Sequence, residues 1–143
     1  EVGSVFLGEP LPGSAGQRCR AGQSWQSGGV GFEFLHPSRE SSVEGNDSSC
    51  VLRVTAGPHS LLLTGDIEAA SERALIRRQV PLDGDIVVVP HHGSMTSSTA
   101  PFVGSVQPDY AVISAGHANR WGLPKDAVVD RWAGAGAAIL NTA

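Results

Sequence analysis

The sequence has 143 residues, of which 41% are hydrophobic and 17% charged. This composition is enough for one globular domain with a sizeable core and excludes a disordered chain. The net charge is −4 and the ten Lys and Arg residues form no basic block, which excludes a DNA-binding module built on a large cationic surface but leaves a metal-dependent nuclease open, because bound cations can supply positive charge.

The chain is predicted to fold as one layered α/β domain without internal repeats. Apolar and β-branched runs predict strands, and apolar residues at helical spacing predict helices. In chain order, the predicted elements are strands over 5–7, 30–35, 50–55 and 59–64, a helix over 67–79, a strand over 86–89, a helix over 99–106, a strand over 110–114, a helix over 124–132 and a strand over 138–140. This order predicts a mixed sheet with helices packed against it.

Polar and glycine-rich stretches between these elements predict loops. Residues 8–29 are rich in Gly, Ser, Pro and Gln. Residues 38–48 predict a surface loop in which Asn46 and Asp47 form turn hydrogen bonds. His36 precedes a proline and is interpreted as a turn residue.

Two predicted strands end in groups that can carry chemistry. The apolar run 61–67 contains Asp66, and the β-branched run 86–89 is followed by a proline and then by His91 and His92. In α/β folds, functional groups lie at the ends of core strands, where a rigid element holds them toward a cleft. We therefore expect these two strand ends to lie side by side.

Each of these groups has more than one interpretation. Asp66 either caps the helix that follows it or is a metal ligand at a strand end. Neighbouring residues on an extended chain point in opposite directions, so one of His91 and His92 would face the cleft and ligate a metal. The other would contact a metal ligand or a substrate.

The remaining polar residues give weaker indications. Ser94 and Ser97 favour turn formation, and no base and acid can be placed to make a serine a nucleophile. A polar loop with His117, Asn119 and Arg120 either reaches the same cleft or is an ordinary surface loop. One Asp and one or two His do not complete a metal site, which needs about three protein ligands.

The two cysteines, Cys19 and Cys50, have no metal-binding spacing. They are either two buried free thiols or one disulfide in an oxidising compartment. The sequence leaves both interpretations open.

Several stretches resemble one protein family. These stretches are NDSSCVLRV, LLLTGDIEAASERAL, IVVVPHHGSMTSS, and DYAVISAG followed by NRWGLP. They are similar to the metallo-β-lactamase-like domain at the C-terminal end of the ComEC/Rec2 family of DNA-uptake competence proteins, over residues 19–142. The resemblance implies an αββα sandwich, of which residues 1–143 would be a single partial domain, the C-terminal half, with a mixed β-sheet and flanking helices.

The resemblance also implies a site. It would hold a divalent metal, Zn or Mn, in a two-metal centre that this chain leaves incomplete. Asp66 would bridge the metals and take part in catalysis. His92, or less favourably His91, would ligate one metal, and the other histidine would act on the substrate. Ser94 and Ser97 would help shape the site, with Ser94 among the catalytic groups.

The implied activity is hydrolysis of phosphodiesters, with DNA, as a single strand or as its phosphodiester backbone, as the substrate and no small organic cofactor. The parent protein would be a bacterial inner-membrane channel, and its channel domain would be a partner on the same polypeptide. This domain would lie on the periplasmic side, which would fit a disulfide between Cys19 and Cys50.

Two departures from the family pattern favour an alternative. The family's upstream metal motif, His-x-Asp-x-Asp-His, is absent from this chain. Leu123 also stands where the family tends to carry a histidine before proline. The alternative hypothesis is a catalytically inactive lobe that scaffolds or gates the same channel.

Overall fold

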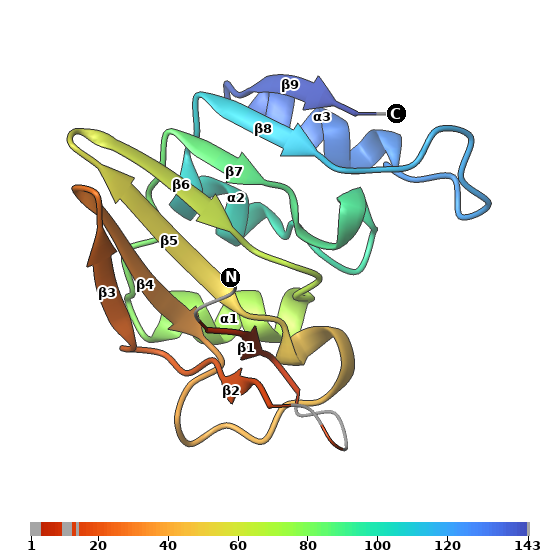
Figure 1. The fold of residues 1–143 in the computed structure, drawn as a ribbon. Coiled ribbons are helices and arrows are strands. Elements are labelled where there is room, and N and C mark those ends of the chain that lie inside the picture. The colour runs from red at the N-terminus through yellow and green to blue at the C-terminus, as the bar shows by residue number, and fades with distance from the viewer. Residues whose placement is uncertain (1–3, 10–12, 14, 143) are drawn as a thin grey trace.

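A seven-stranded mixed sheet dominates the computed structural model, which describes residues 4–9, 13 and 15–142 (Figure 1). The strands lie in chain order and are β3 (Ser24–Ser27), β4 (Val30–His36), β5 (Val51–Ala56), β6 (His59–Leu63), β7 (Ile86–Val88), β8 (Tyr110–Ile113) and β9 (Ala138–Asn141). Strands β3 to β6 pair antiparallel, and β6 to β9 pair parallel. The predicted mixed sheet is confirmed.

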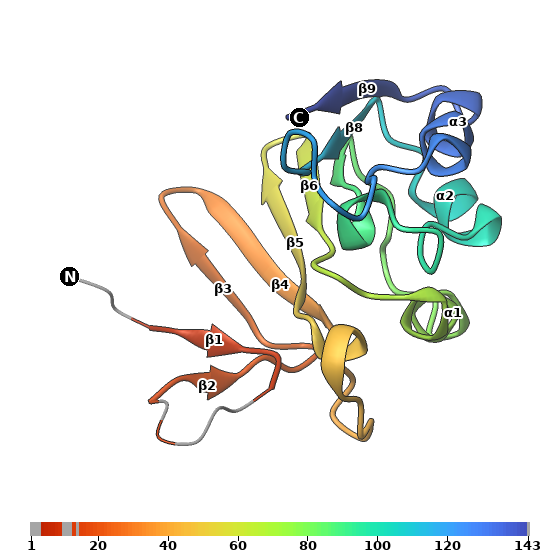
Figure 2. The ribbon, with the colours of Figure 1, turned by 90° about the vertical axis from the view of Figure 1, so that its right-hand side faces the viewer.

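Helices follow the parallel strands, because each parallel pair needs a crossover connection. They are α1 (Ala69–Arg77), α2 (Ala100–Val106) and α3 (Asp126–Gly134). All three lie on one side of the sheet (Figure 2). Two short 3-10 segments are also present, η1 (Gly45–Ser48) before β5 and η2 (Pro90–Gly93), which contains the two adjacent histidines, after β7. Among the described residues, no helix has the length and apolarity that crossing a membrane requires.

The core fills the space between the three helices and the sheet. Alternate residues of the strands point toward the helices and are fully buried, such as Leu62, Val87 and Ala111. On the helices, Leu75, Phe102 and Trp132 are also fully buried against them. Burial of about a dozen such side chains is the main source of stability, since each contributes roughly 1.5–3 kcal/mol.

The other side of the sheet, which we call the open face, is apolar but not covered by helices. Strand register places a continuous set of apolar side chains on it: Trp25, Phe32, Phe34, Leu52, Val54, Leu61, Leu63, Ile86, Val88, Tyr110, Val112 and Leu140. Several remain substantially exposed, with Tyr110 at 46% and Leu140 at 50%. Exposed apolar surface of this extent is typical of a surface that another element covers.

The N-terminal part departs most from prediction. Residues 8–29 were expected to be a loop, but they contain β2 (Gln17–Arg18) and β3; residues 10–12 and 14 of this stretch lie outside the described residues. Strand β1 (Phe6–Leu7) pairs parallel with β2, and Phe6 stacks on Trp25 with ring centroids 5.4 Å apart. The strands were missed because they are short, polar and at a sheet edge.

Two helix boundaries also differ from prediction. Helix α1 begins at Ala69 rather than Ile67, because the turn after β6 holds Asp66 outside the helix. Helix α3 begins at Asp126, so Pro124 lies before it instead of in its first turn. In both cases the first two residues of the predicted helix lie in the preceding loop instead.

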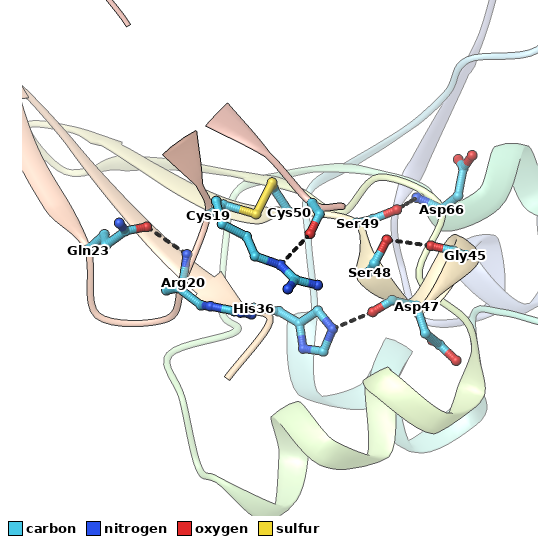
Figure 3. The surroundings of a disulfide bond; sticks show 12 residues. Cys19, Arg20, Gln23, His36, Gly45, Asp47, Ser48, Ser49, Cys50 and Asp66 are labelled. Carbon is cyan, nitrogen blue, oxygen red and sulfur yellow. Dashed lines mark hydrogen bonds between the residues drawn. A yellow bond between two sulfur atoms is a disulfide. The ribbon is translucent and has the colours of Figure 1, made fainter. Parts of the chain in front are cut away.

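A disulfide links Cys19 to Cys50, which settles the alternative that the sequence left open. It joins the segment after β2 to the residue before β5, with the two Cα atoms 5.9 Å apart. Cys19 is fully buried. Figure 3 shows that the residues next to Cys50 lead directly to Asp66, because Ser49 Oγ accepts a hydrogen bond from the Asp66 backbone N–H.

Candidate functional site

The two strand ends singled out in the sequence are neighbours in the sheet. Strands β6 and β7 pair parallel, with Leu63 opposite Val88, so both chains leave the sheet at the same edge. Asp66 follows β6 and His92 follows β7. The expectation that these ends lie side by side is confirmed, and it follows from parallel pairing.

The backbone of the histidine pair was expected to be extended, and this expectation is wrong. His91, His92 and Gly93 lie in the turn η2 with φ of 49°, 55° and 79°, all in the left-handed region. The tight turn, rather than strand alternation, separates the two imidazoles, whose ring centroids are 6.4 Å apart. Gly93 is required here, because a Cβ would lie 2.7 Å from the Cβ of Pro124.

His92 and Asp66 face each other. His92 Nε2 lies 3.5 Å from Asp66 Oδ1, and both side chains are roughly half exposed. His92 Nδ1 lies 2.6 Å from the carbonyl oxygen of Ser114. A carbonyl can only accept, so Nδ1 carries a proton, and Nε2 on the other side of the ring faces the carboxylate. This arrangement is typical of a histidine whose outer nitrogen is anchored so that the inner one can ligate a metal.

Asp66 is not a helix cap, and that interpretation is wrong. The N-cap of α1 is Glu68, whose backbone N–H donates to Asp47 Oδ1 at 2.9 Å. The Asp66 carboxylate is therefore free of a structural role in the helix. The backbone N–H of Asp66 is held by Ser49 Oγ at 3.1 Å.

His91 belongs to a separate polar cluster. Its Nδ1 lies 3.3 Å from Glu68 Oε1 and 3.1 Å from Thr96 Oγ1. Its Nε2 lies 3.4 Å from Asn46 Nδ2. Because the amide nitrogen of Asn46 can only donate, Nε2 accepts and Nδ1 carries the proton. Both nitrogens of His91 are thus engaged, whereas His92 keeps Nε2 available.

Most of this cluster was not recognised from the sequence. Glu68 was given no part in a site, and Asn46 and Asp47 were expected to form turn hydrogen bonds. Asn46 and Asp47 reach the site because η1 packs against the start of α1. The polar sequence of this loop does not predict that contact. Thr96 completes the cluster by donating to Glu68 Oε1 at 2.9 Å.

The hydroxyl residues and the 116–123 loop divide into two groups. Ser97 is buried and donates to the carbonyl oxygen of Pro90 at 2.9 Å, so it stabilises the turn. Ser94 Oγ lies 3.1 Å from Thr96 Oγ1, at the edge of the His91 cluster. Asn119 lines the same cavity as His92, which brings this loop to the site. His117 and Arg120 are exposed on that loop.

A buried glutamate fixes the segment that follows the histidines. Glu72 of α1 is fully buried, and its carboxylate accepts the backbone N–H groups of Ser98 and, at 2.8 Å, Thr99. Burial raises the pKa of this carboxyl, although the two hydrogen bonds and the nearby Arg131 oppose the rise. From the opposite side, Arg131 donates to the Ser98 carbonyl and Trp132 Nε1 to its hydroxyl. The segment is therefore clamped between α1 and α3.

His36 is a buried anchor rather than a turn residue. It ends β4, is 2% exposed, and its Nε2–H donates to the carbonyl oxygen of Asp47 at 2.8 Å. Ser71 Oγ lies 3.2 Å from the same nitrogen. The prediction failed because burial depends on η1 folding over it. Through Asp47, His36 holds η1, and with it Asn46, against the site.

His36 predicts a pH dependence of stability. Burial lowers its pKa from the ordinary value of 6.5, and its Nδ1 has no hydrogen-bond partner among the described residues. The unfolded chain therefore binds the proton first as the pH falls through 6.5, so the free energy of unfolding is expected to decrease below that pH and to be highest above it. Urea unfolding at about pH 7.5 and about pH 5.5 measures the decrease.

The matched variant for this prediction is His36→Gln, whose amide can still donate to Asp47 but does not titrate. It should show a smaller loss of stability between the two pH values than the unmodified protein. His117→Gln, at an exposed histidine, is the control and should retain the full loss. Equal pH dependence in His36→Gln and the unmodified protein would contradict the assignment.

The facing pair of Asp66 and His92 fits two ligands of one metal ion. Two donors about 2.1 Å from a tetrahedral ion lie about 3.4 Å apart, close to the 3.5 Å between Nε2 and Oδ1. A metal ion between them would be held by the carboxylate and by Nε2 of the tautomer whose proton is on Nδ1. Across the described residues, no group of three His, Cys, Asp or Glu side chains is arranged to hold a metal.

Comparison with known families gives one match. Residues 3–117 match the sequence model of the Metallo-beta-lactamase superfamily. The match includes β3 to β8, the Asp66 turn and the histidine turn.

Individual relatives carry names that refer to competence and recombination. Competence protein ComA of Neisseria gonorrhoeae is 41% identical over 98% of this chain and 20% of the relative. Uncharacterized protein YcaI of Escherichia coli strain K12 is 38% identical over 90% and 17%. Recombination protein 2 of Haemophilus influenzae is 38% identical over 87% and 16%. The chain thus spans a fifth or less of the length of the relatives it matches, and its resemblance to the competence family is confirmed.

Proposed function

This chain belongs to the metallo-beta-lactamase superfamily, and we propose that it is part of a metal-dependent phosphodiesterase or nuclease domain of a DNA-uptake competence protein. The observation that carries the proposal is the 3.5 Å approach of His92 Nε2 to Asp66 Oδ1, with Nδ1 of the same ring anchored on the Ser114 carbonyl oxygen. The names of the relatives, one for competence and one for recombination, support DNA as the substrate.

In this proposal Asp66 and His92 hold the metal, which is Zn or Mn. The anchoring of both His91 nitrogens supports His92, rather than His91, as the ligand. The metal would supply an activated water and stabilise the charge that develops on the phosphate. The remaining ligands would come from an upstream segment with the pattern His-x-Asp-x-Asp-His.

His91 and Ser94 act on the substrate side of the site. Glu68 accepts the Nδ1–H of His91, which fixes the ring and its tautomer. Asn46 and Thr96 hold the same ring from other directions. The fixed, partly exposed ring beside the metal ligands would shape the wall that faces the substrate, and the Ser94 hydroxyl would donate to a phosphate oxygen there.

The chain is proposed to be a partial domain whose open face is covered by upstream sequence. Helices cover only one face of the sheet (Figure 2), and the other is a continuous apolar surface. A second sheet packed there would give the αββα sandwich and would bring the missing ligands to the same edge. The domain would belong to a membrane channel polypeptide and lie on its periplasmic side, which the disulfide supports because disulfides persist in oxidising compartments.

The test is metal-dependent DNA hydrolysis by the full-length protein. A labelled single-stranded oligonucleotide is incubated with the purified protein after EDTA treatment and again after Zn²⁺ or Mn²⁺ is restored. We expect hydrolysis to stop with EDTA and return with the metal. Residues 1–143 alone serve as the control and should show no hydrolysis.

A small phosphodiester, bis(p-nitrophenyl) phosphate, assayed in parallel separates a DNA-directed enzyme from one with another phosphoester substrate. Metal-dependent cleavage of the small diester without cleavage of DNA would reject DNA as the substrate. A full-length protein that binds no metal and cleaves neither compound would reject the enzyme and favour the scaffolding or gating lobe.

A further inference from the structure

The cavity that His92 shares with Asn119 has not been given a role in the proposed hydrolysis. Its volume is about 320 Å³, and its lining includes His92, Ser114, Asn119, Trp121 and Leu123. The loop that forms it follows β8 and extends to the same edge of the sheet as the histidine turn after β7 (Figure 1). A cavity of this size holds a small planar ring system.

One side chain fixes the shape of this loop. Asn119 Nδ2 donates to the carbonyl oxygens of Gly116 at 2.9 Å and Leu123 at 2.6 Å, and its Oδ1 accepts the Leu123 N–H at 3.0 Å. The backbone N–H of Gly122 also donates to the Asn119 carbonyl at 3.0 Å. The cavity wall is therefore preformed, so a ligand need not order it on binding.

Trp121 is the most exposed large apolar side chain in this part of the molecule, at 62%. The Arg120 guanidinium lies 4.4 Å from the centroid of its ring. Lys125 Nζ donates to the Trp121 carbonyl at 2.7 Å. One cationic side chain thus lies against the exposed indole and a second lies at its backbone, although Asp126 follows Lys125 in the sequence and the chain as a whole is acidic.

We propose that this cavity binds an unpaired base of the DNA strand, stacked on Trp121. The inference rests on the proposed function and adds a binding subsite to it. An indole gives a stacking surface for any base, and neighbouring cations attract the phosphates on either side of it. The apolar wall at Leu123 suits a base rather than a second phosphate. A base seated here lies beside His92, so its own phosphodiester reaches the metal ligands.

Binding without hydrolysis tests the subsite. The full-length protein is titrated in EDTA with a fluorescent thymidine oligonucleotide of about 12 nucleotides, and with an abasic oligonucleotide of the same length and charge. The unmodified protein is expected to bind the thymidine strand about tenfold more tightly than the abasic strand. Trp121→Leu should remove this preference without changing affinity for the abasic strand, and Trp121→Phe should keep most of it.

Two outcomes would overturn the subsite. One is an equal preference for the thymidine strand in the unmodified protein and in Trp121→Leu. The other is that acrylamide fails to quench the fluorescence of Trp121 in the full-length protein. That result would show that upstream sequence covers the ring. Because EDTA prevents hydrolysis, an unmodified protein that shows no base preference overturns the subsite alone, whereas failure of the hydrolysis assay overturns the proposed function.

Discussion

Asp66→Ala is expected to abolish metal binding in the full-length protein and to lower DNA hydrolysis by about 10³-fold or more. The carboxylate is one of two facing donors, and its removal leaves His92 without a partner for a cation. The fold should survive, because the side chain is 43% exposed and does not cap α1. Metal content by mass spectrometry, hydrolysis rate and thermal unfolding of the same preparation measure the three effects.

The control for this variant is Asp83→Ala. Asp83 is also an exposed carboxylate, at 77%, but it precedes β7 and pairs with Arg53 at the opposite end of the strands. It should retain metal and activity. Activity that persists in Asp66→Ala would reject the assignment of this residue, and an unfolded Asp66→Ala protein would reject the claim that its carboxylate has no structural role.

Removal of the Cys19–Cys50 disulfide is expected to have the largest effect on stability. The two cysteines are 31 residues apart in the sequence, and closing a loop of this length lowers the entropy of the unfolded chain by the equivalent of about 3.5 kcal/mol. Cys19→Ala with Cys50→Ala should lower the free energy of unfolding by roughly that amount. Guanidinium unfolding with and without a reductant measures the difference.

Reduction provides the matched control for the cysteine pair. A reductant should destabilise the unmodified protein to nearly the level of the double variant and should leave the double variant unchanged. A thiol count first establishes that the cysteines of the unmodified protein are oxidised. If a reductant then leaves its free energy of unfolding unchanged, the expected contribution of the disulfide is contradicted. Because Cys50 adjoins Ser49, which holds the Asp66 backbone, metal affinity should also weaken.

The core strands and the juxtaposition of Asp66 with His92 follow from the sequence alone. Apolar β-branched runs predict buried strands regardless of what surrounds them, and parallel neighbours end at the same edge. Thus β6, β7 and β8 were placed correctly within a residue or two. The polar residues that follow two neighbouring parallel strands therefore lie close together.

The surroundings of the site could not be predicted because they depend on contacts between distant segments. Nothing in a polar loop shows that Asn46 will reach His91, or that His36 will be buried under η1. Glu72 has the sequence pattern of an exposed helix charge, yet two backbone N–H groups from the histidine segment make its burial possible. The left-handed turn was missed because few residues other than glycine adopt a positive φ, so two in succession are not expected from sequence.

At two positions of the left-handed turn, the residue type that would be most stable differs from the one that the proposed site requires. His91 and His92 both have positive φ, a conformation that costs a side chain with a Cβ on the order of 1 kcal/mol. Glycine or asparagine would relieve this strain. A library of variants sorted only for heat resistance would therefore tend to replace the two histidines of the proposed site. Engineering this domain for robustness calls for holding both positions fixed and seeking stability elsewhere.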